Sequence, residues 1–453
     1  MKGLINVSQN DTQTSVQTDV EEGVSLENVS AAQSAFSNRK NVRPNDVQLD
    51  VQLKETRSKE AFRSSESLVG KPQNKPQITS LTGIRAALIF WVVLFHMQPE
   101  LAALLPYDPL LHFASAGFLG VDFFFILSGF VIAYNYAERL NPFSLGTYRR
   151  FLSLRLARIY PVHLFSLLLV LLLYLVAMGT GSTTTNPAYY SAHSFIQNLL
   201  LIQAWSLPTA LSWNAIAWAV SCEWLAYLLF PLVLMLTLRV RSATSALGIV
   251  VISLLGMSLG CVVLGHQWPA VQGAGSFGLA RVAVEFPVGC LLYSLYASRW
   301  GKGWRWSAIT PVLWAAVIVS SVSLNAYLSR FATLQENNLL QVYLLSLTPL
   351  FAIAIYALAQ QRGGFSRFFC AKWIEKVAHT SYSLYLTHFI CLIVLRRAFS
   401  VEGFATSSLI VRLLVIGGYL LLMAIAAGGT YYFVEEPSRL WVKNKLLKKT
   451  ARI

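Results

Sequence analysis

Two ionisable side chains, Arg85 and His96, lie eleven residues apart in the first long apolar stretch, ITSLTGIRAALIFWVVLFHMQPE. Eleven steps of an α-helix return the chain to nearly the same face, about 16 Å further along the axis. Ionisable groups within a membrane usually face a protein interior, a cavity or a partner. The pair therefore indicates either a long buried site that is polar at both ends, or an ordinary span with an interfacial anchor at each end.

Two carboxylates within apolar stretches are further candidates for chemistry. Asp122, in GFLGVDFFFILSGFVIAY, lies near the same end of its stretch as His96, so a contact between them could fix the imidazole tautomer and support it as a base. A carboxylate favoured by the start of a helix would explain Asp122 equally well. Glu223 lies in an otherwise uncharged stretch, where we expect it to be protonated or to pair with a cation or a polar ligand.

The segment YRRFLSLRLARIYPVH, interpreted as a cytoplasmic loop, is rich in arginine, and Arg155 and Arg158 are three apart on one helix face. Guanidinium groups bind phosphate with two parallel hydrogen bonds, so this pair could hold a phosphate-bearing donor. Setting the membrane topology or binding lipid headgroups would explain the sign of the charge, but not two guanidiniums on one face. Arg281 and Glu285, four apart in a later stretch, are expected to pair with each other.

The late segment HTSYSLYLTHF places a histidine and a run of hydroxyl groups in an apolar stretch. Hydroxyl groups often hydrogen-bond helices to one another in membranes. Ser381, Tyr382 and His388 are therefore candidates either for acceptor binding or for structural contacts.

The elements that must position these groups are transmembrane helices. Of the 453 residues, 55% are apolar and 13% are charged, and the mean hydropathy is +0.52, which is typical of a protein with many spans. A span needs about 20 mostly apolar residues. Ten stretches qualify: 79–97, 118–136, 160–178, 213–237, 244–264, 279–297, 307–328, 340–360, 380–397 and 409–433. The predicted fold is all-α and polytopic, with about ten transmembrane helices in one membrane domain of residues 76–440.

Small residues and one short stretch refine this prediction. Close approach of a neighbouring helix is favoured by four small residues of the second span, Gly117, Gly120, Ser128 and Gly129. The stretch 195–205 is too short to cross a membrane, so we expect it to be re-entrant or to lie at an interface.

The net charge of +15 is distributed unevenly among the connections, and this pattern indicates the membrane topology. The connections after spans 2, 4, 6 and 8 and the segment after span 10 carry 20 Lys and Arg, and the other connections carry one, Arg330. The positive-inside rule then places both termini in the cytoplasm. Arg396 and Arg397, at the outer end of span 9, run against the rule. The charge does not indicate a nucleic-acid partner, and the expected partners include membrane lipids.

The two ends of the chain differ from the membrane domain. Residues 1–75 are rich in Ser, Gln, Asn and Glu and show no sustained period, so we predict a disordered cytoplasmic tail. Residues 441–453 are predicted to be a basic cytoplasmic tail that touches anionic headgroups. The five scattered cysteines favour small core residues over a disulfide or zinc framework, and no metal site is expected.

Six segments in chain order resemble the motifs of the integral-membrane acyltransferase-3 family, known from O-acetyltransferases of bacterial surface polysaccharides. They are TGIRAALIFWVVLFH, GVDFFFILSGFVI, RLAR, WAVSCEWLAYLLFP, SYSLYLTHF and YFVEEPSRL, between residues 82 and 440. One departure is WAVSCEW, where Trp224 follows Glu223 and Tyr227 keeps only one aromatic residue of the usual pair. A second is that no soluble esterase-like domain follows, so transfer is expected to be completed within the membrane domain.

The resemblance implies transfer of an acyl group, usually acetyl from acetyl-CoA, to a hydroxyl of a saccharide such as an exopolysaccharide, an O-antigen or a lipid-linked oligosaccharide. It makes His96 the essential histidine and Arg85 its basic partner, and it places Arg155 and Arg158 in donor binding. His96, oriented by Asp122 or Glu223, is expected to act either as a general base or as a transient acyl carrier. Acyl-CoA is a co-substrate, and no permanently bound cofactor is expected. The expected location is the bacterial inner membrane.

Two alternatives remain open at this stage. Buried ionisable residues fit a transporter or flippase for a saccharide or an acyl donor equally well. The acceptor of an acyltransferase could also be a small natural product. The sequence does not indicate the acyl chain length or the oligomeric state.

Overall fold

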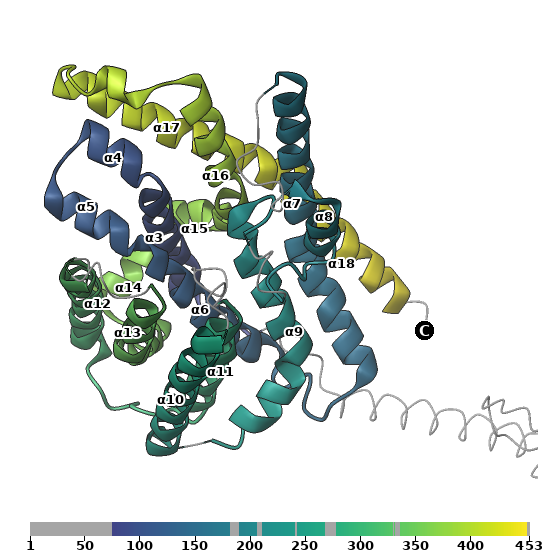
Figure 1. Cartoon of the computed structure of the whole chain (residues 1–453). Coiled ribbons are helices and arrows are strands. Elements are labelled where there is room, and N and C mark those ends of the chain that lie inside the picture. The colour runs from purple at the N-terminus through teal and green to yellow at the C-terminus, as the bar shows by residue number, and fades with distance from the viewer. Residues whose placement is uncertain are drawn as a thin grey trace, which may run out of the picture. The chain divides into compact units, whose positions relative to one another are not determined.

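The computed structural model of the chain describes residues 75–181, 190–205, 211–240, 242–267, 278–328, 330 and 336–450. Throughout these ranges every regular element is a helix (Figure 1), so the all-α prediction is confirmed. The predicted disordered tail lies outside the described residues apart from Lys75.

All ten predicted spans coincide with helices. These are α3 (Thr79–His96), α6 (Gly120–Tyr136), α7 (Leu145–Gly179), α9 (Trp218–Thr237), α10 (Ala243–Gln267), α11 (Gly278–Ala297), α12 (Trp306–Leu328), α13 (Glu336–Ala359), α16 (Ser381–Ala398) and α17 (Leu409–Thr430). Among described residues, seven helical segments are long and apolar enough to cross a membrane, or eight if α15 (Lys372–His379) and α16, bent by 56°, form one span. The locations are therefore supported, and the count of ten only roughly.

Shorter helices connect the long ones. The predicted interfacial stretch 195–205 overlaps the second half of α8 (Ala192–Leu199), which is only eight residues long. The others are α4 (Gln98–Leu104), α5 (Asp108–Ser115), η1 (Ala116–Leu119), η4 (Ala215–Ala217), α14 (Gly363–Phe369), η6 (Val401–Phe404), the π-helical turn η7 (Tyr431–Glu435) and α18 (Glu436–Thr450). The predicted basic tail is thus largely part of α18, which lies against α7 (Figure 1).

The arginine-rich segment is not a loop, as the sequence suggested, but the first part of α7. This helix has 35 residues and is about 50 Å long, so it begins well before the apolar stretch 160–178. The long helix places Arg155 and Arg158 inside the bundle. A connecting loop would have left them at its edge.

Close backbone packing between α6 and α11 fixes the centre of the bundle. A Cβ atom on Gly129 would lie 2.0 Å from the carbonyl oxygen of Phe286, and one on Gly289 would lie 2.1 Å from that of Ile126. Only glycine permits this approach, so the predicted close contact along the second span is confirmed. The backbones of α6 and α11 therefore lie in direct contact at the centre of the bundle.

The ends of the helices define two sides of the bundle. Lys75, just before α3, contacts Glu138 after α6 and Tyr293 near the end of α11, and Thr79 contacts Gln361 after α13. We call this the basic side, because the arginine- and lysine-rich connections leave from it. His96 ends α3 at the opposite, far side, where α4 begins.

Candidate active site

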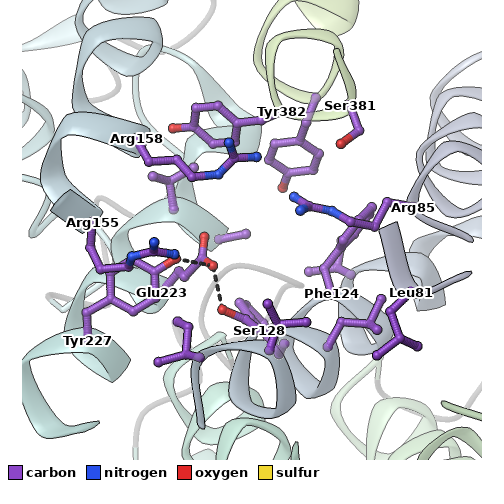
Figure 2. A pocket seen from close by; sticks show the side chains of 18 residues that line it. Leu81, Arg85, Phe124, Ser128, Arg155, Arg158, Glu223, Tyr227, Ser381 and Tyr382 are labelled. Carbon is purple, nitrogen blue, oxygen red and sulfur yellow. Dashed lines mark hydrogen bonds between the residues drawn. The ribbon is translucent and has the colours of Figure 1, made fainter. Parts of the chain in front are cut away.

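A cavity of about 120 Å³ lies among α3, α6, α7, α9 and α16, and we call it the arginine cavity (Figure 2). Its polar lining consists of Arg85, Ser128, Arg155, Arg158, Glu223, Tyr227, Ser381, Tyr382 and Tyr385. Apolar side chains of α3, α6 and α9 complete the wall. Six residues proposed from sequence therefore meet in one place, although they come from four helices.

Three guanidinium groups face this cavity (Figure 2). Arg155 Nη2 donates to the Tyr136 hydroxyl at 3.2 Å, and its guanidinium lies 5.2 Å from the centre of that ring. Arg85 lies 6.0 Å from the centre of the Phe124 ring, and no carboxylate among the described residues forms an ion pair with it. Among the described residues, neither Arg85 nor Arg155 has the carboxylate partner that a charged group in a membrane interior usually has.

Glu223 is the carboxylate of the cavity, and hydroxyl groups hold it. Ser128 donates to its Oε1 at 2.7 Å and Tyr227 donates to the same oxygen at 2.5 Å (Figure 2). This confirms the expectation of a polar partner for Glu223. With one carboxylate against three guanidiniums in the lining, the cavity carries a net positive charge.

A second carboxylate, Glu435, acts on the cavity from behind. It is fully buried, lies 3.3 Å from Arg158 Nη1, and accepts a hydrogen bond from Ser383 at 2.7 Å. The π-helical turn Tyr431–Glu435 presents it there, and such turns are frequent at functional sites. Sequence analysis did not single out Glu435. The segment YFVEEPSRL was noted only as a resemblance, and nothing in its spacing indicates which arginine it meets.

Ser381 and Tyr382 line the cavity from the start of α16 (Figure 2). The Tyr382 hydroxyl donates to the carbonyl of Ile159 at 2.6 Å, which is a structural contact between α16 and α7. The Ser381 Oγ is buried and has no hydrogen-bond partner in the described part of the chain. Of the two candidates, Ser381 is the one with an unused polar atom.

His96 does not line the arginine cavity but pairs with His388. The Nε2 of His388 lies 3.3 Å from the Nδ1 of His96, and that Nδ1 lies 3.0 Å from the carbonyl oxygen of Val92. Because a carbonyl only accepts, His96 Nδ1 must carry the proton. The same reasoning applies to His388 Nδ1, which is 2.9 Å from the carbonyl of Leu384. This tautomer leaves the Nε2 lone pair of His96 uncommitted.

Tyr385 connects the cavity with the histidine pair along α16. It lines the cavity, its hydroxyl donates to Ile216, and its ring centre lies 6.2 Å from that of His388. Tyr382, Tyr385 and His388 follow one another in steps of three residues, so each lies beside the next on the surface of α16. This row of side chains leads from the cavity toward His96.

The carboxylate contact predicted for His96 is wrong. Both oxygens of Asp122 are bound by Arg281, with Nε at 2.8 Å from Oδ1 and Nη2 at 2.7 Å from Oδ2. Arg281 of α11 therefore pairs not with Glu285, as predicted, but with Asp122 of α6. The two helices pack closely enough to bring these side chains together. Glu223 meets hydroxyl groups, so the partner of His96 is an imidazole and not either carboxylate.

The far side holds an ion pair that explains a topology anomaly. Arg396, which opposed the positive-inside rule, donates to buried Glu100 at 2.6 and 3.0 Å. It also donates to the carbonyl oxygen of His96 at 2.7 Å. Arg396 thus fixes the end of α3 where the histidine lies. Glu100 was missed because it follows the apolar stretch and looked like an ordinary loop residue.

These observations define a polytopic helical membrane protein with a positively charged cavity among its spans and a histidine pair beyond it. The model of the acyltransferase domain family matches residues 78–434. The chain therefore belongs to the integral-membrane acyltransferase-3 family, as the resemblance indicated.

Curated relatives are similar to parts of the chain. The acyltransferase MdmB of Streptomyces mycarofaciens is 32% identical over 165 residues, which are 36% of this chain and 40% of that protein. The O-acetyltransferase OatA of Staphylococcus aureus is 25% identical over 341 residues, or 72% of this chain and 52% of the relative. The peptidoglycan O-acetyltransferase OatA of Listeria monocytogenes is 23% identical over 336 residues, or 70% and 49%.

The chain spans about 40–52% of the length of these relatives. No solved structure matches it. The comparisons therefore establish the family, and the arrangement of the site comes from the structure described above.

Proposed function

We propose that this protein is a membrane O-acyltransferase that moves an acetyl group from cytosolic acetyl-CoA to a hydroxyl of a saccharide acceptor. The observation that carries the proposal is the convergence of Arg85, Arg155 and Arg158 on one cavity whose far wall leads to His96. Guanidinium groups suit the phosphates and carbonyls of a CoA arm. The two OatA relatives, named as O-acetyltransferases, support acetyl as the group transferred.

His96 supplies the proton chemistry in this proposal. The acceptor oxygen attacks the thioester carbonyl carbon, the carbon–sulfur bond breaks, and the hydroxyl proton passes to the Nε2 of His96. The imidazolium then protonates the departing thiolate, which leaves as CoA. His388 accepts from Nδ1 and so holds the ring in the tautomer that the step requires.

A variant of this route uses the same nitrogen as a nucleophile. Nε2 would take the acetyl group first, release CoA, and pass the group to the acceptor in a second step. The two routes differ in one observable: incubation with acetyl-CoA alone labels the protein covalently only in the second. Intact-protein mass spectrometry in the absence of acceptor distinguishes them.

The orientation follows from the charge of the connections. With the basic side in the cytoplasm, both termini are cytoplasmic, Arg85 faces the donor, and His96 faces the outer leaflet of a bacterial inner membrane. The Listeria relative is named for peptidoglycan, a saccharide polymer, which supports a saccharide acceptor on that face. Small natural products are the competing acceptor class.

The test is acetyl transfer by the purified full chain in proteoliposomes. We expect release of free CoA thiol from acetyl-CoA that depends on added acceptor, and a mass increase of one acetyl group on that acceptor. Surface glycans compared with and without the intact gene identify the natural acceptor. Uptake of saccharide or donor without release of CoA would instead establish the transporter alternative.

A further inference from the structure

A second cavity, of about 490 Å³, lies on the basic side, and we call it the tyrosine–tryptophan cavity. It is formed by the ends of α6 and α11, the turn after α11, and residues that follow α13. It shares no lining residue with the arginine cavity. Its volume falls within the range of about 300–1,000 Å³ that is usual for small-molecule sites.

The lining of this cavity is strongly positive. Lys75 is neutralised by Glu138 at 2.8 Å and also donates to the Tyr293 hydroxyl at 3.0 Å. Burial opposes the charge on Lys75, but these two hydrogen bonds outweigh it and raise the pKa of its ammonium group. Arg299, Lys302 and Arg362 also line the cavity, and in the described ranges none of them has an ion pair. Three positive charges therefore remain for a ligand.

One wall of the cavity is aromatic and held in place. Tyr296 and Trp300 belong to it, and Trp300 packs against Trp304 and Tyr356 with ring centres 4.8 and 5.3 Å apart. The Tyr356 hydroxyl donates to the carbonyl oxygen of Trp300 at 2.7 Å. Arg299 keeps a φ of 58°, a conformation usually taken by glycine at the end of a helix. The turn thus presents a charge beside a fixed aromatic surface.

The two cavities are neighbours along α6. Val131 and Ile132 line the arginine cavity, and Tyr134 lines the second one. Val131 and Tyr134 are three residues apart, so they share one side of α6 and lie about 4.5 Å apart along its axis, with the second cavity nearer the basic side.

We propose that the tyrosine–tryptophan cavity binds the phosphorylated adenosine end of acyl-CoA, an inference that rests on the proposed acyl-CoA donor. Arg299, Lys302 and Arg362 meet the phosphate groups, and Tyr296 and Trp300 offer aromatic faces to the adenine ring. The pantetheine-side phosphate and the pantetheine arm then follow α6 into the arginine cavity, where the guanidinium groups meet them. Anionic lipid headgroups carry the same phosphate chemistry and are the competing source.

The first experiment compares two donors with the full chain in detergent micelles. Acetyl-CoA contains the adenosine end, and the acetyl thioester of N-acetylcysteamine lacks it. In the variant Arg299→Gln/Lys302→Gln/Arg362→Gln we expect the KM for acetyl-CoA to rise by about tenfold or more, because charge-assisted hydrogen bonds are lost. The kcat with acetyl-CoA and the rate with the short thioester stay unchanged.

Arg305→Gln is the matched control, since Arg305 belongs to the same basic connection but does not line the cavity. It leaves the KM for acetyl-CoA at the wild-type value. An equal loss with both donors, or no loss with acetyl-CoA, overturns the proposal.

The second experiment measures binding without catalysis. Adenosine 3′,5′-bisphosphate is titrated calorimetrically into the wild type and the triple variant in micelles free of phospholipid. We expect the bisphosphate to bind to the wild type and to the Arg305→Gln control, but not to the triple variant. This result supports the cavity assignment even if no donor yields acetyl transfer, in which case only the proposed function fails.

Nanodiscs distinguish lipid headgroups from acyl-CoA as the source of the phosphate groups that the cavity binds. Activity is compared in phosphatidylcholine discs with and without phosphatidylglycerol. If the triple variant changes only the response to phosphatidylglycerol, and the bisphosphate does not bind to the wild type, the cavity is a headgroup site and the proposal is wrong.

Discussion

Arg85 and Arg281 are both arginines within spans, but their surroundings are opposite. Arg281 is 1% exposed, with two of its nitrogens on Asp122 and its guanidinium 5.3 Å from the ring centre of Trp218. Arg85 has an aromatic neighbour and, in the ranges that the structure describes, no ion pair. The first charge is satisfied by the fold, and the second is the one that the proposed function assigns to the donor.

This difference separates structural from functional charge more reliably than position in the sequence does. Both arginines lie in apolar stretches. Each also has a carboxylate nearby, either a few residues away in the same helix or in a neighbouring helix. A bound pair such as Asp122–Arg281 uses its hydrogen-bonding capacity within the protein. A site that binds substrate must keep capacity unused, as the Arg155 Nε and the Ser381 Oγ do among the described residues.

The largest expected effect on activity is that of His96→Ala. Removing the proton acceptor should lower acetyl transfer by about 10²–10⁴-fold, because this is the usual contribution of a general base. The thermal unfolding midpoint in detergent should stay near that of the wild type, since His96 is only partly buried. Wild-type transfer by this variant would show that His96 has no part in the chemistry.

The largest expected effect on stability is that of Asp122→Leu. It leaves the Arg281 charge buried without its partner, which costs about 3–5 kcal/mol in comparable buried pairs. We expect a large fall in folded yield on size-exclusion chromatography.

The double variant Asp122→Leu/Arg281→Met is its control, because it removes both charges and should recover most of the yield. If the single variant folds normally and loses only activity, Asp122 belongs to the functional group and the contrast with Arg85 fails.

Arg85→Gln should show the converse pattern. We expect the KM for acetyl-CoA to rise by roughly 10–100-fold, corresponding to a charge-assisted hydrogen bond of about 1.5–3 kcal/mol. The unfolding midpoint should be unchanged, because no ion pair of the described structure is broken. Steady-state kinetics and thermal unfolding on one preparation measure both; a destabilised variant with normal kinetics would contradict the assignment.

The positions of the spans were predictable because membrane helices need long apolar stretches, which are a local property of the chain. The convergence of Arg85, Arg155 and Arg158 was expected from the motif resemblance, and the shared face of the last two followed from helical spacing. The contacts between side chains of different helices were not predictable. Asp122 meets Arg281 because Gly129 and Gly289 let α6 and α11 approach, and such a contact between distant segments has no local signature.

The same limit explains why His388 was undervalued. The sequence left it as a candidate for acceptor binding or for a structural contact, and only the packing of α16 against α3 shows that its partner is His96. Glu435 and Glu100 were overlooked for a related reason. Each lies just outside an apolar stretch, and its importance comes from an arginine far away in the sequence.

The smallest expected effect concerns His388, which acts on His96 as a positioning residue. Replacement of His388 by Gln keeps a polar side chain but removes the fixed imidazole acceptor 3.3 Å from His96 Nδ1. A hydrogen bond of this kind contributes about 0.5–1.5 kcal/mol, so kcat should fall by roughly 2–10-fold while the KM for acetyl-CoA stays the same. The pH dependence of kcat should also shift, because the imidazole of His96 loses the neighbour that orients it. A change in KM with an unaltered pH profile would instead mean that His388 contacts the substrate. The site with unused hydrogen-bonding groups, unlike the satisfied Asp122–Arg281 pair, would then include His388 on α16 as a second ligand-facing group.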